Sequence, residues 1–521
     1  MNADADRDPH SLFRFHGGLR LAPNKAISTG QPLVEVPVPS RLVQPLSQHA
    51  GAPSEPVVEV GERVLRMQPL SRSGSFISAP VHASSSGVVV AIEERTVAHP
   101  SGLAAPCVVI ETDGEDAPWD GLDPLSNYTT LNPPALRGRV RDAGIVGLGG
   151  AAFPTAVKLN VGGVLKALIL NGAECEPYIS CDDTLLRERP QEVVSGAGIM
   201  LHALELNRCI IALEDDMPEA WEALAEAVAR VGDPRIELIS VPAIYPEGGE
   251  RQLITVLTGE EVPAAGFPAD IGYLVHNVGT AAAVSRAVLQ GEPLHRRIVT
   301  VTGRGVARPT NVEVRFGTPV ADVIAACGGY TEHARHLIVG GAMMGYALPH
   351  DDVPVVKATN CIVVGTAEEI APRGPARACI RCGECARACP AKLLPQQLFW
   401  HARADDFERA EEAHLFDCIE CGCCDLVCPS HIPLTRYFRY AKAEIWSQAR
   451  DRVRAEHAKR RFDNRADRIE REREAKRRRL AERTQALNTD ATDEATRKAV
   501  IDEIMQRVRD RKDPRSGEDE G

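Results

Sequence analysis

Short apolar runs separated by turn residues follow an irregular N-terminal arm (residues 1–32). Between residues 33 and 124 the runs VVEVGERVL, SAPVHASSSGVVVAIEE and CVVIET alternate with glycine, proline and serine. Strands this short, with turns this frequent, predict a small β barrel or sandwich.

The pattern changes to alternating strands and helices over residues 125–296. LKALILNGAE, RCIIALEDD and RIELISVPAIYP have the pattern of buried strands, and PQEVVSGAGIMLHALEL and MPEAWEALAEAVARVG that of helices between them. This alternation predicts a parallel or mixed sheet covered by helices. A third unit, residues 297–369, returns to short strands around one helix in VRFGTPVADVIAACGG.

Charged residues dominate the end of the chain. Residues 441–521 are rich in Arg, Glu and Ala, and Ala441 to Arg483 holds 16 Lys/Arg against 9 Asp/Glu. This composition predicts a long solvated helix as far as Arg483, with disorder near the end. An alternative is that its KRRF and KRRRL segments contact anionic lipid or an acidic partner.

Length and composition exclude several classes of protein. A chain of 521 residues predicts several domains, since one core seldom grows past about 250–300 residues. With 44% hydrophobic and 25% charged residues it resembles soluble globular proteins, and it has no apolar run near the roughly 18–20 residues of a membrane helix. The N-terminus, MNADADRDPH, lacks the apolar region of a secretory signal. The net charge of −12 argues against nucleic-acid binding by the whole chain.

The cysteine spacing carries the strongest chemical signal. Two runs follow the pattern Cys-x2-Cys-x2-Cys-x3-Cys-Pro, one from Cys379 and one from Cys418. This is the bacterial ferredoxin pattern for two [4Fe–4S] clusters, in which three cysteines wrap one cubane and the fourth reaches its neighbour. The predicted ligands are Cys379, Cys382, Cys385 and Cys428 for one cluster, and Cys418, Cys421, Cys424 and Cys389 for the other.

Structural zinc held by Cys-x2-Cys pairs is the alternative for these motifs, although two full copies with the Cys-Pro ending favour iron–sulfur. Cys423, beside Cys424, is interpreted as a packed spectator, because the spacing favours Cys424. The alternative is that Cys423 replaces Cys424 as a ligand. The cysteines in apolar contexts are interpreted as small buried residues: Cys107, Cys209, Cys327 and Cys361. For Cys175 and Cys181, core or wall positions are favoured over redox roles.

The glycine-rich run GIVGLGGAAFPTAVKL, residues 144–159, precedes a helix-compatible stretch. Backbone N–H groups at Gly147, Gly149 and Gly150, with a helix N-terminus behind them, suit a phosphate, and Lys158 adds a full charge. Glycines serve turns and close packing equally well, so the run alone leaves both interpretations open.

Four segments in order resemble the flavoprotein subunit of respiratory complex I. The glycine run resembles GxGGAGFPTGxKW, NGAECEPY resembles NADExEPG, YPEGGERQLI stands at the place of GEETAL, and HNVGTAAAV resembles NVET. The resemblance implies a Rossmann-like α/β core at residues 125–296 that binds FMN and NADH.

The resemblance also implies two sets of site residues. Those facing the flavin are Gly147, Gly149, Gly150, Lys158, Asn171, Glu174, Asn277 and Thr280, with the glycines and the lysine on its phosphate. Those on the nicotinamide side are Phe153, Glu247 and Glu250. The chain departs from the pattern at Ala152, which replaces a glycine, and at Leu159, where a tryptophan is expected. A core that keeps the fold and binds nothing therefore stays open.

The order of the parts resembles a wider family. Residues 33–124 resemble the hammerhead fold of biotinyl and lipoyl carriers without their modifiable lysine, which makes them a scaffold. Residues 297–369 resemble a β-grasp soluble-ligand-binding unit, and residues 370–440 a two-cluster ferredoxin domain. Together they resemble the C-subunit family of Rnf (Rsx) ion-translocating electron transport complexes. The eight cluster ligands argue against the related subunit of the Na⁺-pumping quinone reductase.

That resemblance implies a peripheral electron-transfer subunit on the cytoplasmic side of the inner membrane, held by integral and peripheral subunits of its complex. The complex would be a translocase of the NADH:ferredoxin oxidoreductase type, coupling electron flow to ion movement. Electrons would pass between NADH, FMN and two [4Fe–4S] clusters, with ferredoxin or flavodoxin acting through the complex. The alternative is a non-catalytic iron–sulfur relay that docks soluble ferredoxin and keeps a vestigial flavin site.

Overall fold

The computed structural model describes residues 12–121, 123–370, 374–490 and 494–510. Two compact units divide the chain, residues 1–442 and 443–521. The start of the N-terminal arm and the last residues of the tail lie outside the described residues. None of the helices in the described ranges is long and apolar enough to cross a membrane.

The first β unit is an antiparallel sheet with a small strand pair beside it. The sheet order is β2 (Arg41–Pro45), β7 (Ala104–Thr112), β6 (Gly87–Thr96) and β4 (Arg63–Val64), and the pair is β3 (Glu55–Pro56) with β5 (Ser71–Arg72). Leu42, Val89 and Ile110 pack in its core. The short strands agree with the turn-rich pattern of the sequence.

The second unit is a four-stranded parallel sheet covered by helices on both faces. Its strand order is β10 (Ile236–Val241), β9 (Cys209–Glu214), β8 (Ala167–Gly172) and β11 (Tyr273–Asn277). Leu168 and Leu170 of β8 pack into one core and Ala167 and Ile169 into another. Since both faces are buried, these strands are apolar at nearly every position, which is why they could be predicted.

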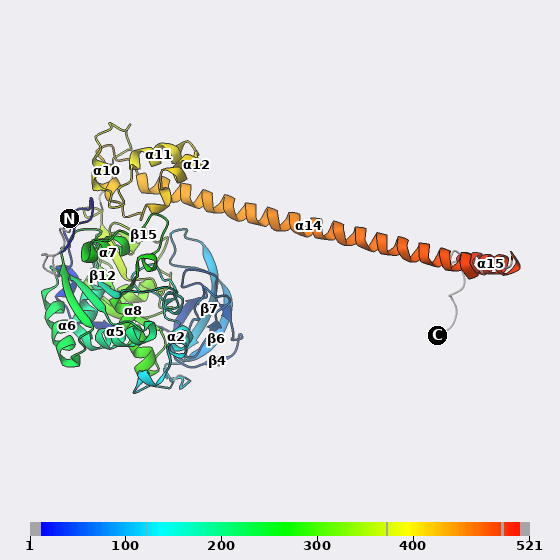
Figure 1. Ribbon diagram of the computed structural model, residues 1–521. Coiled ribbons are helices and arrows are strands. Elements are labelled where there is room, and N and C mark those ends of the chain that lie inside the picture. The colour runs from blue at the N-terminus through cyan, green and yellow to red at the C-terminus, as the bar shows by residue number, and fades with distance from the viewer. Residues whose placement is uncertain (1–11, 122, 371–373, 491–493, 511–521) are drawn as a thin grey trace. The chain divides into compact units, whose positions relative to one another are not determined.

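The helices of this unit are short to medium in length (Figure 1). In chain order they are α1 (Ala26–Thr29), α2 (Pro133–Asp142), α3 (Thr155–Lys158), α4 (Cys181–Glu188), α5 (Pro190–Leu204), α6 (Pro218–Val231), α7 (Glu250–Thr258) and α8 (Val278–Ser285). Helices α5 and α6 match the two helices predicted from the sequence.

The third unit is a six-stranded mixed sheet. Its order is β1 (Val34–Glu35), β13 (Thr310–Arg315), β12 (Arg296–Thr302), β16 (Cys361–Thr366), β14 (Ala334–Val339) and β15 (Tyr346–Ala347), with α9 (Val320–Ala326) beside it. Strand β1 comes from the segment that the sequence boundary at residue 33 places in the first β unit. It pairs with β13 instead, because neighbours in a sheet need not be neighbours in sequence.

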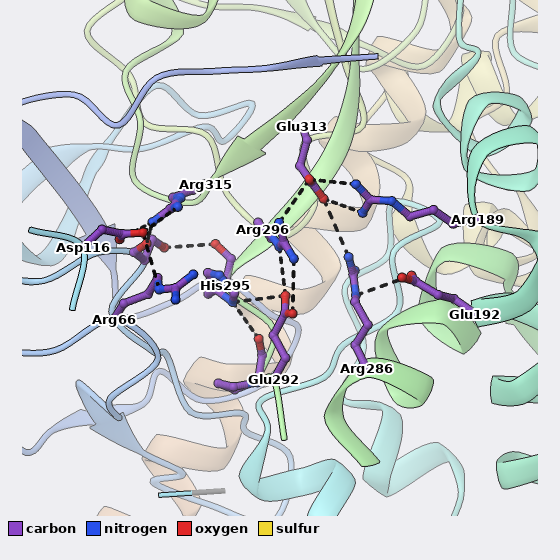
Figure 2. Close-up of polar contacts among 12 residues, drawn as sticks. Arg66, Asp116, Arg189, Glu192, Arg286, Glu292, His295, Arg296, Glu313 and Arg315 are labelled. Carbon is purple, nitrogen blue, oxygen red and sulfur yellow. Dashed lines mark hydrogen bonds and ion pairs between the residues drawn. The ribbon is translucent and has the colours of Figure 1, made fainter. Parts of the chain in front are cut away.

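Partly buried ion pairs join these three units (Figure 2). Glu313 on β13 accepts two hydrogen bonds from Arg189 at 2.6 and 2.8 Å and a third from Arg296 at 3.1 Å. Arg315 on the same strand pairs with Asp116 of the first β unit. The network therefore holds the units in one arrangement, because separating them would leave buried charges unpaired.

The cysteine-rich segment folds into short helices: α10 (Glu384–Ala388), α11 (Pro395–Arg403), α12 (Phe407–Glu412) and α13 (Cys423–Leu426). Helix α14 (Leu434–Asp490) follows, and α15 (Glu494–Asp510) ends the described chain. The sequence predicted a helix as far as Arg483, with disorder near the end of the chain. The described residues remain helical farther, because Ala, Arg, Lys and Glu favour helix even where nothing is buried.

Candidate functional site

The two cysteine motifs have the same backbone conformation. Arg381 and Glu420 occupy equivalent positions with φ of 58° and 59°, and Gly383 and Gly422 follow with φ of 81° and 77°. The N–H of Arg381 donates to Cys379 Sγ, and that of Glu420 donates to Cys418 Sγ, each at 3.4 Å. These turns direct backbone N–H groups at sulfur, as cluster-binding loops require.

Five cysteines line one cavity, and the four of them that stand at motif positions are named the buried set: Cys389, Cys418, Cys421 and Cys424. The fifth is Cys423. The buried set contains the residues that the sequence assigned to one cluster. Apolar side chains such as Leu398 and Phe438 complete the walls. The hydroxyl of Thr435 also lines the cavity and has no hydrogen-bond partner among the described residues. A buried unpaired hydroxyl beside four thiols fits a cluster that fills this space.

The N-terminal arm closes one side of the buried set. His16 Nδ1 lies 2.9 Å from the carbonyl oxygen of Cys389, and the N–H of Gly18 donates to the Ala388 carbonyl at 3.2 Å. A side chain at Gly17, where φ is 71°, would meet the Ala388 backbone at 2.7 Å. This part of the arm is irregular and packs against the cysteines, whereas Ala26–Thr29 of the arm forms α1. Only a glycine fits at the closest approach of the arm to the cysteines.

The other predicted ligands form the surface set: Cys379, Cys382, Cys385 and Cys428. Cys382 is exposed and the other three are half-buried. Two hydrogen bonds bring the ends of the motifs together, from the Arg377 N–H to the Ser430 carbonyl at 2.8 Å and from Ser430 Oγ to the Ala378 carbonyl at 2.9 Å. They place the segment after Cys428 beside the segment before Cys379, as the predicted exchange of the fourth ligand requires.

Cys423 occupies the place that Glu384 has in the first motif. Its side chain is fully buried and packs with Tyr245, Ala388 and Ile419. The same cluster of side chains contains Leu19, Leu21 and Met343, which come from outside the cysteine-rich segment. The second motif therefore uses a small apolar residue where the first presents a carboxylate to solvent, and packing explains Cys423.

The glycine-rich run forms a tight loop closed by a bridge between Val146 and Pro154. The Gly147 N–H donates to the Phe153 carbonyl at 2.8 Å, and the Leu148 N–H donates to Thr280 Oγ1 at 3.0 Å. At Gly150, where φ is 108°, an added Cβ would meet nothing within 4 Å. The loop thus leaves open space above Gly150, while the Gly147 N–H is already used within the loop.

The helix expected behind this loop is a single turn, α3. Gly162 and Gly163 follow it closely, and their backbone freedom disfavours a longer helix. The sequence predicted that a helix N-terminus helps to hold the phosphate, and this expectation is corrected here. The single turn of α3 aligns too few peptide dipoles to attract an anion. Lys158, the last residue of α3, supplies the positive charge here, and its Nζ pairs with Glu250 at 2.5 Å.

Two asparagines lie at the carboxyl ends of neighbouring strands β8 and β11, where parallel sheets place their sites. Asn171 Nδ2 donates to the Gly248 carbonyl at 2.8 Å. Asn277 Nδ2 donates to Asp182 at 2.6 Å, and its Oδ1 caps α8 by accepting from the Gly279 N–H at 2.8 Å. The structure thus brings Asn171, Asn277 and the glycine loop to one sheet edge.

Glu174 is buried at the N-terminus of α4. Its carboxylate accepts from the N–H groups of Asp182 and Asp183 at 3.0 and 3.3 Å and from the Cys181 thiol at 3.3 Å. Burial and the nearby Asp182 raise the pKa of Glu174 to about 8. Glu174, Cys181 and Asp182 lie close enough to share a cation, but the same contacts satisfy the end of the helix.

Glu247 is fully buried, and neither of its carboxyl oxygens has a hydrogen-bond partner among the described residues. Burial, together with Glu214 and Asp215, raises the pKa of Glu247 to about 8. The side chain is therefore mostly a neutral acid at pH 7. It belongs to the turn that also carries Gly248, whose N–H donates to Cys175 Sγ at 3.3 Å.

Sequence reasoning missed the tyrosine that joins the two cofactor regions. Tyr245, two residues before Glu247, donates its hydroxyl hydrogen to the carbonyl oxygen of Cys421 at 2.6 Å. It also missed Asp182, the partner of Asn277, and Lys25, which pairs with the buried Glu214 at 3.1 Å. Only Tyr245 carried a sequence signal, because it opens the segment YPEGGERQLI.

Four protein families match parts of the chain. Residues 13–115 match the RnfC Barrel sandwich hybrid domain, 140–286 the Nuo51 FMN-binding domain, 298–347 the SLBB domain and 378–432 the 4Fe-4S dicluster domain. The predicted FMN and iron–sulfur cofactors are thereby confirmed, and zinc is set aside. The family matches also confirm the predicted flavoprotein-like α/β core and the predicted ferredoxin-type domain.

Curated relatives match most of the chain. The C-subunit of the ion-translocating oxidoreductase complex of Vibrio cholerae (Classical Ogawa 395) is 47% identical over 88% of this chain and 59% of its own length. The protein of the same name from Pseudomonas aeruginosa is 46% identical over 91% of this chain and 60% of its own. The chain thus spans about three fifths of the length of these relatives.

Among solved structures, the NAD+-reducing [NiFe]-hydrogenase in the air-oxidized state is 23% identical, with a TM-score of 0.43, over 57% of this chain and 61% of that chain. This likeness is too weak to support a conclusion about function.

Proposed function

This chain belongs to the C-subunit family of ion-translocating oxidoreductase complexes, and on that premise we propose that it is the peripheral electron-transfer subunit of a membrane-bound NADH:ferredoxin oxidoreductase. The complex would couple electron flow to ion translocation. The supporting observation is the Tyr245–Cys421 hydrogen bond, because it joins the FMN-binding region directly to a cysteine of the dicluster domain.

The buried set and the surface set are the proposed ligands of the two clusters. The cavity lined by Cys389, Cys418, Cys421 and Cys424 supports the first assignment. The exchange of fourth ligands between the motifs is supported by the hydrogen bonds that Ser430 makes to the segment before Cys379.

The proposed flavin residues lie around the glycine loop and the ends of β8 and β11. Gly147, Gly149, Gly150 and Lys158 would hold the phosphate, and Asn171, Glu174, Asn277 and Thr280 the remainder of the flavin. When bound, FMN takes up two electrons as a hydride and releases them singly, which suits clusters that accept one electron each. The open space above Gly150 supports the phosphate position.

Phe153, Glu247 and Glu250 are the residues proposed for the nicotinamide side. Phe153 lies on the glycine loop, where its carbonyl accepts from Gly147. Glu250 is half-exposed and pairs with Lys158. Lys158 can therefore leave Glu250 and pair with a phosphate when one binds. Glu247, buried and neutral, would help to keep water away from hydride transfer.

Purification under anaerobic conditions, with iron and flavin analysis and an NADH bleaching test, examines this proposal. We expect eight irons, one FMN and rapid bleaching of the visible spectrum by NADH. Eight irons with neither flavin nor bleaching would contradict the enzymatic part.

Lys158→Ala isolates the flavin site. We expect the variant to lose FMN on purification, because the phosphate loses its counter-charge, while its iron content is unchanged. Lys166→Ala is the matched control, since Lys166 also pairs with a glutamate, Glu260, but lies outside the loop. Equal FMN content in the two variants would contradict the assignment.

One observation favours the rival function, a non-catalytic relay with a vestigial flavin site. Gly147 and Lys158 already have partners within the chain, as they would in a site that has lost its ligand. Under this alternative, Lys158→Ala changes nothing, and the clusters exchange electrons only with a soluble ferredoxin.

The finer assignments of fold and location are also proposals. We propose that residues 33–124 form a hammerhead-like scaffold and residues 297–369 a β-grasp unit, supported by the barrel sandwich hybrid and SLBB matches. The domain boundaries at residues 32, 124, 296, 369 and 440 are also proposals. We propose attachment to the cytoplasmic side of the inner membrane through integral partner subunits. Release of the chain from membranes that lack those subunits would support this location.

A further inference from the structure

The duplicated cysteine motifs carry opposite charge. Residues 374–404, around the first motif, contain five Lys/Arg and one Glu, whereas residues 413–433, around the second, contain three Asp/Glu and no Lys/Arg. The two motifs otherwise share their backbone conformation. Cluster binding does not require this charge difference, because both motifs present the same N–H groups to sulfur. The difference in charge is therefore explained by the contacts that each motif makes with its surroundings.

The acidic motif has its counter-charges within the protein. Glu420 pairs with Arg439 at 2.8 Å and with Lys442 at 2.9 Å, both at the start of α14. Lys442 also donates to the Cys418 carbonyl at 2.6 Å. Its neighbour Ile419 packs against the fully buried Cys423. The second motif is thus neutralised and covered by the chain itself.

The basic motif is exposed instead. Ile380, the counterpart of Ile419, is 68% exposed, and Arg377 and Arg381 beside it are also exposed. The Arg381 guanidinium lies over the ring of Trp400, 5.6 Å from its centroid, and Trp400 is itself 41% exposed. We name Ile380, Trp400, Arg377 and Arg381 the arginine face. Arg387 and Lys392 do not belong to it, because they pair with Glu384 and Glu261.

This face has the composition of a protein interface. Aromatic and arginine side chains are enriched at such interfaces, while lysine is depleted. The exposed Ile380 and Trp400 provide apolar surface, and Arg381, which lies over the Trp400 ring, adds positive charge beside it. Arginine pairs with carboxylates in two parallel hydrogen bonds and is less strongly hydrated than lysine, which suits binding to another protein.

We propose that the arginine face is the docking surface for an acidic, one-electron redox protein. This inference rests on the proposed function, since it makes the surface set the side where electrons are exchanged with the partner. Cys382 is exposed and directly follows Arg381 in the chain. A carboxylate-rich partner would be steered there by the local positive charge, although the chain as a whole carries a net charge of −12.

The test uses the full chain with both clusters in place and a plant-type [2Fe–2S] ferredoxin, a small acidic protein, as the probe. We expect binding that weakens as salt rises from about 20 to about 200 mM, in the manner of charge-steered association. Arg381→Glu should weaken binding about tenfold and reduce the salt dependence. This substitution installs the residue that position 420 carries in the same backbone conformation, so the loop retains its fold.

Two further variants make the test specific. Arg377→Glu, which changes a different residue of the arginine face, should weaken binding to a similar extent. Arg409→Glu, the same charge change at an exposed residue of α12, should leave binding unchanged. Equal binding by Arg381→Glu and the unaltered chain, or equal loss in Arg409→Glu, would overturn the proposal.

A lipid surface is the competing source of negative charge. Vesicles of about 30% phosphatidylserine in phosphatidylcholine should not depend on Arg381 for binding. If they bind in an Arg381-dependent manner and the ferredoxin does not, the face is a membrane contact and the proposal fails. Iron content and bleaching by NADH are measured on every variant. Iron content and bleaching can be normal in variants whose ferredoxin binding does not change on substitution of Arg381 or Arg377. In that case the electron-transfer function stands and only the docking surface is wrong.

Discussion

The buried and surface cysteine sets are two outcomes of one duplicated motif. In both, a non-glycine residue with φ near 60° precedes the second cysteine and a glycine follows it. The buried set lies beneath the N-terminal arm, α14 and the turn at Tyr245, whereas Cys382 of the surface set is exposed. Burial, hydrogen bonding and nearby charge all tune iron–sulfur potentials. Identical local geometry can therefore give two sites that differ in burial and in surrounding contacts.

Removing one cysteine ligand from each set is the strongest test of the difference between the buried set and the surface set. Cys424→Ser should lower the iron content from eight to four and also loosen the contact with the FMN-binding region, because its cluster fills an internal cavity. Cys385→Ser should lower the iron content equally but leave that contact intact. Cys423→Ser is the control and should keep eight irons. Iron analysis and limited proteolysis distinguish the three, and loss of iron in Cys423→Ser would show that the ligand register is wrong.

Iron release should also distinguish the two sets. With an oxidant and a chelator present, we expect two phases of four irons each. The faster phase belongs to the surface set, since Cys382 is exposed while Cys389, Cys421 and Cys424 are buried. In Cys385→Ser only the slow phase should remain. A single phase in the unaltered chain would contradict the difference in burial.

Arg381 and Glu420 occupy equivalent loop positions, but only the ion pairs of Glu420, in the second motif, should matter for stability. Lys442→Met should cost about 2 kcal/mol, because it leaves Glu420 with one cation and removes a hydrogen bond to the Cys418 carbonyl. Arg381→Met changes the exposed counterpart of Glu420 and should change the free energy of unfolding by less than about 0.5 kcal/mol. Denaturation of the cluster-loaded protein measures both, and equal costs would remove the asymmetry.

The turn that covers the buried set should make stability depend on pH. The pKa of Glu247 is about 8 in the folded chain against an ordinary value near 4.5. The folded state therefore holds the proton more tightly, and stability falls as pH rises between these two values. Glu247→Gln should remove part of this slope and stabilise the flavin-free protein at pH 8 by on the order of 2 kcal/mol. Thermal unfolding at pH 6 and 8 tests this, and an unchanged slope would contradict it.

The smallest effect is expected at the contact between the regions. Tyr245→Phe keeps the ring and removes only the hydroxyl that donates to Cys421. We expect a loss of about 1 kcal/mol, the usual contribution of one hydrogen bond. Tyr330→Phe is a control at a distant tyrosine that donates to the surface carboxylate of Asp351. A loss no larger than that of the control would show that the bond does not secure the buried set.

Local patterns were predictable wherever neighbouring residues alone decide them. Strand β8 and helix α5 followed from apolar runs and periodicity. The helix behind the glycine loop was overestimated, because propensity alone does not show where α3 stops. The pairing of β1 with β13 depends on residues far apart in the chain and could not be deduced from either segment.

The sequence by itself determined that this chain has eight cysteines at cluster spacing, a glycine loop of the flavoprotein kind and opposite charge around its two cysteine motifs. Only the tertiary structure decided which motif is buried. That outcome depends on Tyr245, Lys442 and the N-terminal arm, which reach the buried set from other parts of the chain: Tyr245 and Lys442 at the second motif, and the arm at Cys389. Burial is a property of packing between segments, and spacing within one segment does not encode it.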